Sequence, residues 1–313
     1  MPAEVDMPAE VALTSVPAER HPLISAQRKI GILLATPAAI LLLSLVIGPT
    51  ALVALLSLTD YQLGMAGFRY VGLNNYSAML SDADFHRSMV QTAIYAAIVV
   101  PLSFALGLLA ALLIEARLRL KIWYRALYFL PVAGTLVALA TAWQVILHPS
   151  FGFLNVLLSG LGLEKTRFLS DPALALPTLA AIGVWQLLGF NMVLFLAGLS
   201  SIPRDLYEAA QIDGADSGWR RFLLVTWPML GPVSMFVIVI SVIRAFSVFE
   251  TVVVMTDGGP AKTTSVVLFF LYEQGYRFFK IGYASAVAVS FFVIVSAFAL
   301  LQARFLDRRV HYR

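Results

Sequence analysis

Six long apolar runs dominate the sequence and decide what it can fold into. They cover residues 30–58, 90–114, 126–147, 174–199, 222–256 and 282–305. Each reaches the roughly 20 residues that a helix needs to cross a bilayer. Of the 313 residues, 60% are hydrophobic and 13% are charged, against about 25% charged residues in an average soluble domain. The sequence therefore predicts an all-α polytopic membrane protein with six transmembrane helices.

Prolines lie in or at the ends of most of these runs. A proline kinks a membrane helix, and the bilayer tolerates the kink when neighbouring groups satisfy the freed carbonyls. We therefore expect kinks near these prolines, which are Pro37, Pro49, Pro101, Pro131, Pro177, Pro228 and Pro232.

The polar ends of the chain frame the membrane region. Residues 1–29 are polar and contain four prolines, a composition typical of a disordered tail. We expect a disordered cytoplasmic tail over residues 1–29, a membrane domain over 30–306 and a short cytoplasmic tail over 307–313. Because the chain contains no cysteine, disulfides, thiolate catalysis and cysteine metal sites are excluded.

The distribution of Lys and Arg predicts the orientation. With both termini in the cytoplasm, the segments on the inside hold 14 of the 22 basic residues and those on the outside hold 7, with Arg244 inside a span. Cytoplasmic segments carry the excess of positive charge. This topology also places residues 204–219 in the cytoplasm.

Residues 204–219 form the most polar run in the second half of the chain. A short helix is expected over 205–210, with Leu206, Ala209, Ala210 and Asp213 on one face, where the two alanines let a partner approach closely. Gly214 and Gly218 are expected to end the helix and turn the backbone.

The sequence Glu208-Ala209-Ala210, followed by Gly214 and Pro228, resembles the signature loop of ABC-importer permeases, most closely that of the carbohydrate-uptake branch. In that family the loop is a cytoplasmic coupling helix that docks into an ATPase subunit. The resemblance assigns ATPase coupling to Tyr207, Glu208, Ala209, Ala210, Asp213, Gly214 and Ala215.

Two further stretches are similar to the same branch. Residues 70–76 are similar to the first external loop of sugar permeases, and the run from Met255 to Pro260 resembles that of the larger permease in maltose and glycerol-phosphate systems. The resemblance implies the transmembrane domain of a type I ABC importer in a bacterial plasma (inner) membrane. It also implies the partners: a second homologous permease, two ATPase subunits that hold ATP and Mg, and an extracytoplasmic substrate-binding protein. The chain itself would need no cofactor and would not be an enzyme.

Two charged residues lie well inside the predicted spans, away from their ends. A charge at the bilayer centre costs about 2.5–3.5 kcal/mol on insertion scales, so Arg244 and Glu250 should face a water-filled cavity or a partner helix. In a continuous helix Arg244 shares a face with Ser241 and Val248, whereas Glu250 points elsewhere. Arg244 is expected either to border a translocation path or to bond to the partner permease.

A polar and aromatic stripe follows the fourth apolar run. Gly183, Gln186, Phe190 and Asn191 recur at helical spacing, and sugar sites combine an aromatic face with amide groups; simple helix packing would give the same stripe. By resemblance to maltose-type permeases, the matching positions include Leu187. Leu187, Ala245 and Val248 cannot hydrogen-bond, which departs from that pattern. The predicted substrate path comprises Gly183, Gln186, Phe190, Asn191, Arg244, Ala245 and Val248.

Three functions are compatible with these sequence features. The first is a carbohydrate importer, and the second is the same machinery carrying glycerol-3-phosphate or another polar organic solute. The third is an ion-coupled secondary carrier, against which the scarcity of carboxylates in the spans argues. The four histidines lie far apart in tails and loops, so no metal site is predicted, and no nucleotide- or nucleic-acid-binding pattern is present.

Overall fold

The protein is helical throughout the part that the structure describes. The computed structural model describes residues 22–116, 121–215 and 218–307. Within these ranges the extended structure is limited to one isolated bridge between Thr59 and Tyr70. The predicted all-α class is confirmed.

The chain divides into two compact units, residues 1–52 and 53–313. The first contains α1 (Pro22–Leu42), the π-helical turn η1 (Leu43–Ile47) and the first part of α2 (Gly48–Leu56). Side chains from residue 31 to 52 are all exposed, as suits a helix surrounded by lipid. Helix α1 begins at Pro22, ahead of the predicted tail boundary at residue 29, and residues 1–21 and 308–313 lie outside the described ones.

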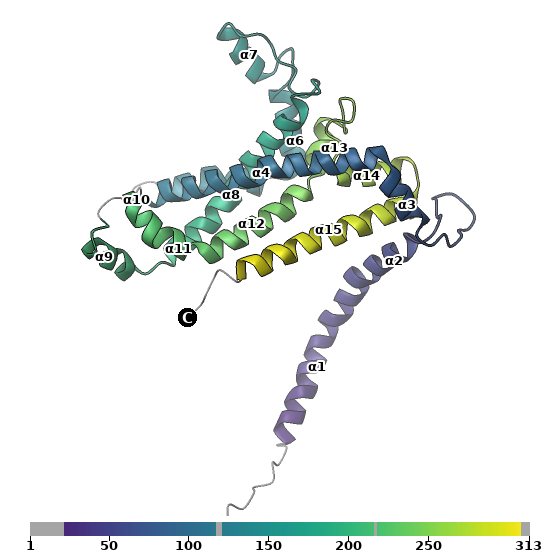
Figure 1. Ribbon diagram of the computed structural model, residues 1–313, viewed down its shortest axis with the longest axis horizontal. Coiled ribbons are helices and arrows are strands. Elements are labelled where there is room, and N and C mark those ends of the chain that lie inside the picture. Colours follow the sequence, from purple (N-terminus) through teal and green to yellow (C-terminus); the bar gives the residue numbers. More distant parts are fainter. Residues whose placement is uncertain (1–21, 117–120, 216–217, 308–313) are drawn as a thin grey trace, which may run out of the picture. The chain divides into compact units, whose positions relative to one another are not determined.

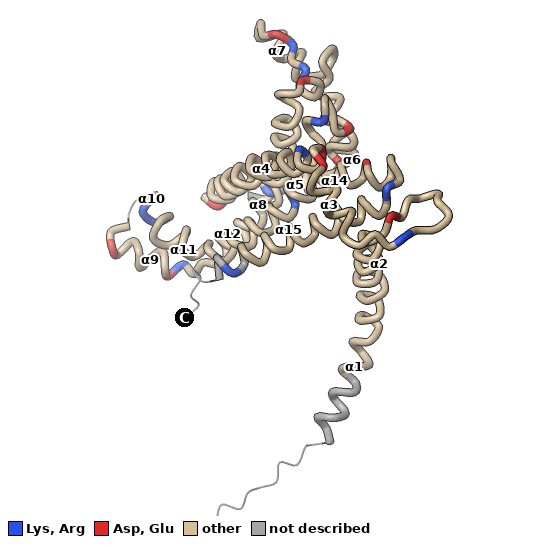
Figure 2. Tube along the Cα trace, turned by 45° about the vertical axis from the view of Figure 1, so that its right-hand side comes forward, with Lys and Arg blue, Asp and Glu red and all other residues tan. Residues whose placement is uncertain are grey.

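Long helices pack side by side in the second unit (Figure 1). Helix α4 (Ala83–Ala116) contacts α8 (Ala175–Ser200) along much of its length, and α12 (Gly231–Phe246) packs on both. Helix α15 (Ile281–Asp307) packs on α12, and α5 (Lys121–Ala133) packs on α8. Most charged residues lie at helix ends and in connections (Figure 2), as expected of helices that cross a bilayer.

Five helical segments are long and apolar enough to cross a membrane, and a bent pair makes a sixth if it counts as one span. The pair consists of α5 and α6 (Leu136–Ile146), which meet at 98°. The predicted run 126–147 is therefore not a single straight helix. Its bend follows Pro131, one of the expected kink positions, and includes Gly134.

The predicted run 222–256 is divided into several helical pieces. The chain passes through α10 (Gly218–Arg221), the π-helical turn η2 (Phe222–Thr226) and α11 (Trp227–Met229) before α12, and then through α13 (Glu250–Met255). The middle residues of η1 and η2 lie four positions before Pro49 and Pro228. A proline ring clashes with the carbonyl four residues earlier, and the wider π turn relieves that clash. Helix α4, in contrast, continues through Pro101.

Short elements close the end of the bundle opposite α9 (Arg204–Ile212). They are α3 (Asn74–Ser81), α14 (Val267–Tyr272) and the π-helical turn η3 (Glu273–Arg277), while α7 (Phe153–Gly160) lies between α6 and α8 in sequence. Lys262, in the turn after α13, forms an ion pair of 2.6 Å with Asp84 in the first turn of α4.

Asp82 caps the start of α4. Its Oδ1 accepts hydrogen bonds from the N–H groups of Asp84 at 2.8 Å and Phe85 at 3.4 Å, and its Oδ2 accepts one from the Tyr283 hydroxyl at 2.7 Å. Partial burial acts to raise the pKa of the Asp82 carboxyl, but these hydrogen bonds to the charged form outweigh it and lower the pKa. The ionised Asp82 therefore ties α4 to α15.

Two apolar cores follow one another along α4, α8 and α12. The first, here called the α13-side core, contains Tyr95, Val99 and Leu187 among its buried residues. The second, the α9-side core, contains Leu108, Met192 and Val237. Each of the three helices contributes to both cores, so the cores are two levels of one bundle.

A glycine allows α4 and α8 to approach closely near the junction of the two cores. A Cβ at Gly107 would lie 2.8 Å from Cβ of Asn191 and 3.2 Å from the backbone nitrogen of Met192. Small residues at such crossings let membrane helices pack backbone to backbone.

The substitution Gly107→Val should therefore push α4 and α8 apart. Overpacking of this kind costs about 1–3 kcal/mol, so we expect a lower melting temperature of the purified protein in detergent. Gly160→Ala is the control, because a Cβ there meets no atom within 4 Å. Equal melting temperatures for the two variants would contradict the close packing of α4 on α8.

Candidate functional site

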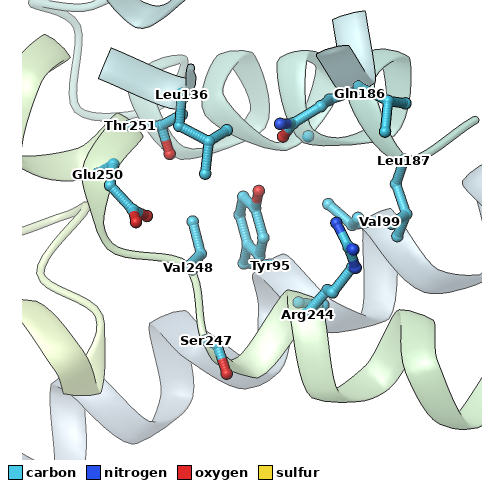
Figure 3. A pocket seen from close by; sticks show the side chains of 13 residues that line it. Tyr95, Val99, Leu136, Gln186, Leu187, Arg244, Ser247, Val248, Glu250 and Thr251 are labelled. Carbon is cyan, nitrogen blue, oxygen red and sulfur yellow. The ribbon is translucent and has the colours of Figure 1, made fainter. Parts of the chain in front are cut away.

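A cavity of about 240 Å³ lies among α4, α5, α6, α8, α12 and α13 (Figure 3). Its walls combine apolar side chains with a few polar ones, the mixture typical of small-molecule sites. The lining residues are Tyr95, Val99, Val132, Leu136, Gly183, Gln186, Leu187, Arg244, Ala245, Ser247, Val248, Glu250 and Thr251.

Two interrupted helices border this cavity. The break between α5 and α6 falls between Val132 and Leu136, and the break between α12 and α13 contains Ser247 and Val248. Within a membrane, irregular backbone is tolerated only where protein or a water-filled space surrounds it. The two breaks therefore belong with the cavity, and they place polar backbone groups beside it.

Opposite charges face the cavity without pairing. The guanidinium carbon of Arg244 lies 4.3 Å from the centroid of the Phe190 ring, which is a cation–π contact. Among the described residues, no ion pair joins Arg244 or Glu250 to another side chain. In Figure 3 Tyr95 extends between the two charged groups. The cavity can therefore offer both a cation and a carboxylate to a solute.

Tyr95 reaches the cavity because α8 has a glycine opposite it. A Cβ at Gly183 would overlap the Tyr95 hydroxyl, so a larger residue there would displace the ring. Tyr95 is only 4% exposed, and its ring belongs to the α13-side core. The same side chain thus stabilises the fold and carries a hydroxyl to the cavity wall.

Thr251 contributes a hydroxyl that has no hydrogen-bond partner. Its Oγ1 is buried and unbonded, and the residue lines the cavity. A buried polar group without a partner is costly. The described residues contain no group of side chains that could hold a metal ion.

Most residues of the predicted substrate path meet at this cavity. Gly183, Gln186, Arg244, Ala245 and Val248 line it, and Phe190 lies beneath the Arg244 guanidinium. Whether these residues contact a substrate stays a prediction.

Asn191 departs from the predicted arrangement. It is fully buried and does not line the cavity. Its amide is bonded to Ser103 and Ser241 instead.

The expected separation of Arg244 and Glu250 is wrong. Both residues line the cavity, whereas a continuous helix would point them to different faces. Helix α12 ends at Phe246 and α13 begins at Glu250, so helical spacing does not relate the two side chains. No proline or glycine marks this break, so it could not be predicted from the sequence.

The contributions of α4, α5 and α6 to the cavity were not predicted from the sequence. Tyr95 and Val99 lie on α4, while Val132 and Leu136 flank the bend between α5 and α6. A tyrosine inside an apolar run was the one available signal for Tyr95, since its hydroxyl needs a polar neighbour.

A second candidate site is α9 with the turn that follows it. The N–H of Gly214 bonds to the carbonyl of Gln211 at 3.2 Å, and the N–H of Ala215 bonds to the carbonyl of Ala210 at 2.9 Å. With Gly214 at φ +82°, this is a Schellman motif, which requires a residue that tolerates the left-handed conformation. The spacing from Ala210 to Gly214 thus encodes a helix with a fixed end.

One side of α9 packs on the bundle and the rest is exposed. Tyr207 and Ala210 pack on the α9-side core, and the Tyr207 hydroxyl lies 3.1 Å from Oγ1 of Thr226. Ala215 is buried, whereas Leu206, Glu208, Ala209, Ile212 and Asp213 are exposed. Of the four residues predicted to share one face, Leu206, Ala209 and Asp213 are exposed, whereas Ala210 packs against the bundle.

Residues 103–312 match the family described as the inner membrane component of binding-protein-dependent transport systems. The chain belongs to this family. The predicted resemblance to ABC-importer permeases is confirmed, and the fold is that of a type I importer transmembrane domain.

Named relatives support this membership. The permease is 34% identical over 248 residues to the sn-glycerol-3-phosphate transport system permease protein UgpA of Agrobacterium fabrum, covering 78% of this chain and 83% of UgpA. It is 35% identical over 232 residues to the trehalose/maltose transport system permease protein MalF of Thermococcus litoralis, covering 74% and 78% of the two chains.

A solved structure shares the fold. A chain of the bacterial alginate ABC transporter, in complex with an alginate pentasaccharide-bound periplasmic protein, superimposes with a TM-score of 0.82 at 22% identity and covers 93% of this permease and 98% of that chain.

The unpaired hydroxyl of Thr251 predicts an unusual stability effect. Thr251→Val should leave the solute-free permease as stable or raise its stability by about 1 kcal/mol, because the substitution removes a buried unbonded group. Thr264→Val is the matched control, since that hydroxyl is buried and bonded to Thr256 at 2.8 Å and to the Gly259 carbonyl at 2.6 Å. It should lose about 1 kcal/mol. Thermal unfolding in detergent measures both, and a loss of similar size at Thr251 would contradict this assignment.

Proposed function

We propose that this permease is one of two membrane subunits of an ATP-driven sugar importer. The second subunit would be a homologous permease, and two ATPase subunits would hold ATP and Mg. A substrate-binding protein outside the membrane would deliver the solute. The permease itself would perform no covalent chemistry. One observation carries the proposal. This member of the family combines a cavity lined in part by polar side chains with an exposed helix, α9, that packs on the same helix bundle.

The excess of Lys and Arg supports a topology with both termini and α9 in the cytoplasm of a bacterial inner membrane. In this orientation α9 faces the ATPase compartment. The connections near α3, α7 and α14 then face the binding protein.

The geometry of α9 supports a role in coupling to the ATPase. Its helical end is fixed by the Schellman bonds of Gly214 and Ala215, and its inner side is held by Tyr207 and Ala210. A force applied to the exposed side, which carries Glu208 and Ala209, would therefore pass to the bundle and not be lost in a mobile loop.

The chemistry of the cavity supports a polyhydroxylated solute. Gln186 and Glu250 offer hydrogen-bond donors and acceptors, while Val99, Leu136 and Val248 form an apolar wall. Sugars present hydroxyl groups around an apolar ring face, and this set of side chains complements both. The names of the relatives MalF and UgpA agree with a carbohydrate or a glycerol phosphate as solute.

Arg244 favours a second candidate, which is glycerol-3-phosphate or another anionic polar solute. Its guanidinium faces the cavity and has no anionic partner among the described residues. Guanidinium groups bind phosphate in a bidentate manner. Glu250 in the same cavity opposes an anion, which is why a neutral sugar remains the first candidate.

Substitutions in α9 test the coupling role. Glu208→Lys reverses the charge of an exposed residue, and Gly214→Pro replaces a residue at φ +82° with one fixed near −65°. Both should abolish ATP-dependent uptake in vesicles while leaving the amount of permease in the membrane unchanged. Arg304→Glu reverses the charge of an exposed residue on α15, outside α9 and the cavity; it is the control and should transport normally.

Affinity purification in mild detergent completes this test. The unsubstituted permease should bring down a second permease and an ATPase, and Glu208→Lys should retain the permease but lose the ATPase. Uptake that persists without any ATPase and follows an ion gradient would instead establish a secondary carrier and overturn the proposal.

Substitutions at the cavity test the solute. Gln186→Ala combined with Phe190→Ala should raise the solute concentration for half-maximal sugar uptake by about tenfold or more. The first substitution removes a cavity-lining amide and the second removes the ring that holds the Arg244 guanidinium, and each interaction is worth about 1 kcal/mol. Val193→Ala, at an exposed position of α8 outside the cavity, should leave it unchanged. Unaltered affinity in the double variant would remove this cavity from the transport path.

A comparison of labelled sugar with labelled phosphate ester separates the two candidates. For a sugar importer, the ester is not transported by the unsubstituted complex. For an anion importer, the ester is transported and Arg244→Gln abolishes its uptake.

A further inference from the structure

Asn191 joins three helices through a closed set of hydrogen bonds. Its Nδ2 donates to Oγ of Ser103 on α4 at 3.3 Å and to Oγ of Ser241 on α12 at 3.1 Å. The Ser241 hydroxyl donates back to Oδ1 of Asn191 at 3.2 Å, and the Ser103 hydroxyl donates to the carbonyl of Val100 at 3.2 Å. Every donor of these three side chains therefore has an acceptor. We call Ser103, Asn191 and Ser241 the Asn191 cluster.

The Asn191 cluster is sealed from solvent, since all three residues are 0% exposed. Polar groups in such surroundings are costly unless every one of them is bonded. Simple helix packing would not need them, because small apolar residues pack as closely. The polar set thus specifies one mutual arrangement of α4, α8 and α12, as buried polar groups do when they fix a register.

The cluster lies one helical turn from the cavity on all three helices. Val99 and Ser103 are four residues apart on α4, Leu187 and Asn191 are four apart on α8, and Ser241 and Ala245 are four apart on α12. Residues at this spacing lie above one another on one face of a helix. Val99, Leu187 and Ala245 all line the cavity, so the cluster lies directly next to it on the side toward α9.

On its other side, the cluster adjoins the α9-side core. Met192 follows Asn191 on α8 and belongs to that core, as does Val237, one turn before Ser241. Tyr207 and Ala210 of α9 pack on the same core. The Asn191 cluster is therefore located where the part of the bundle that holds α9 meets the part that holds the cavity.

We propose that Asn191 is a positioning residue and not a substrate contact. By bonding α4 and α12 to α8, it keeps Gln186 and Arg244 facing the same cavity, and it makes the three helices move as one body when α9 is displaced. This proposal rests on the proposed transport function, which supplies the displacement.

Variants that remove or rearrange the bonds test the proposal. Asn191→Leu keeps the approximate volume but makes no hydrogen bond, and Ser241→Ala removes one partner. Both should raise the solute concentration for half-maximal uptake, by about tenfold or more for Asn191→Leu, which removes all three hydrogen bonds of the amide. The exchange Asn191→Ser with Ser241→Asn restores an amide opposite a hydroxyl and should recover most of the affinity.

Ser88→Ala is the matched control. Ser88 is also a fully buried serine on α4, but its hydroxyl donates only to the carbonyl of Phe85 within the same helix, at 2.8 Å. This variant should transport like the unsubstituted complex. If Asn191 touched the substrate, Ser241→Ala would be silent and the exchange would not recover affinity, and either result overturns the proposal.

A distance measurement reads out the positioning without transport. The chain contains no cysteine, so Ala181→Cys on α8 and Phe236→Cys on α12, both exposed, accept spin labels at chosen places. In the co-purified complex, the distribution of distances between the two labels should be narrow. The unsubstituted complex, treated with the same label, shows the background from partner chains. The distribution should broaden with Asn191→Leu and narrow again with the exchange.

The two readouts separate the two proposals. An unsubstituted complex that transports neither sugar nor phosphate ester refutes the proposed function, whereas the label distances still decide the role of Asn191. A distribution that stays equally narrow in Asn191→Leu overturns the positioning role, whatever the complex transports.

Discussion

The structure depends on one constraint, which is that backbone N–H and C=O groups inside a bilayer must find partners within the protein. Regular helices satisfy it over α4, α8, α12 and α15. Where the helices are interrupted, the freed backbone groups need other hydrogen-bond partners. The π-helical turns before Pro49 and Pro228 accommodate these prolines, and two further interruptions, at residues 134–135 and 247–249, adjoin or contain residues that line the cavity. The helix breaks and the cavity therefore occur together, because the breaks free polar backbone groups that can face the cavity.

The need to pair backbone groups also explains the spacing of the loop motif. A helix end leaves carbonyls without hydrogen-bond partners. At the end of α9, the N–H groups of Gly214 and Ala215 donate to two of these carbonyls. Gly214 tolerates the left-handed conformation that this arrangement needs, and the small Ala215 fits a buried position. The motif therefore encodes a rigid, capped helix, a local property that holds whatever α9 binds.

Local features of the fold were predictable from the sequence, and interruptions without a local signal were not. Apolar runs predicted the spans because length and hydropathy are local properties, and Pro131 predicted the bend after α5. The break before Glu250 lies in the run Phe246-Ser247-Val248-Phe249, which contains no helix breaker. Its consequence, that Arg244 and Glu250 face one cavity, therefore required the structure. Asn191 shows the same limit, because its position on a polar stripe could not reveal that Ser103 and Ser241 satisfy its amide.

The length of the helices determines how a displacement at α9 can reach the cavity. Helix α8 has 26 residues and is about 39 Å long at 1.5 Å per residue, and it continues without a break from Gln186 to the turn before α9. A packed helix does not bend easily, since close-packed interiors transmit strain. In the proposed transport cycle, a movement of α9 would therefore shift Gln186 together with the α9-side core. Arg244 lies on another helix and follows only if α12 is held to α8, and in this bundle the bonds between Asn191 and Ser241 provide that link.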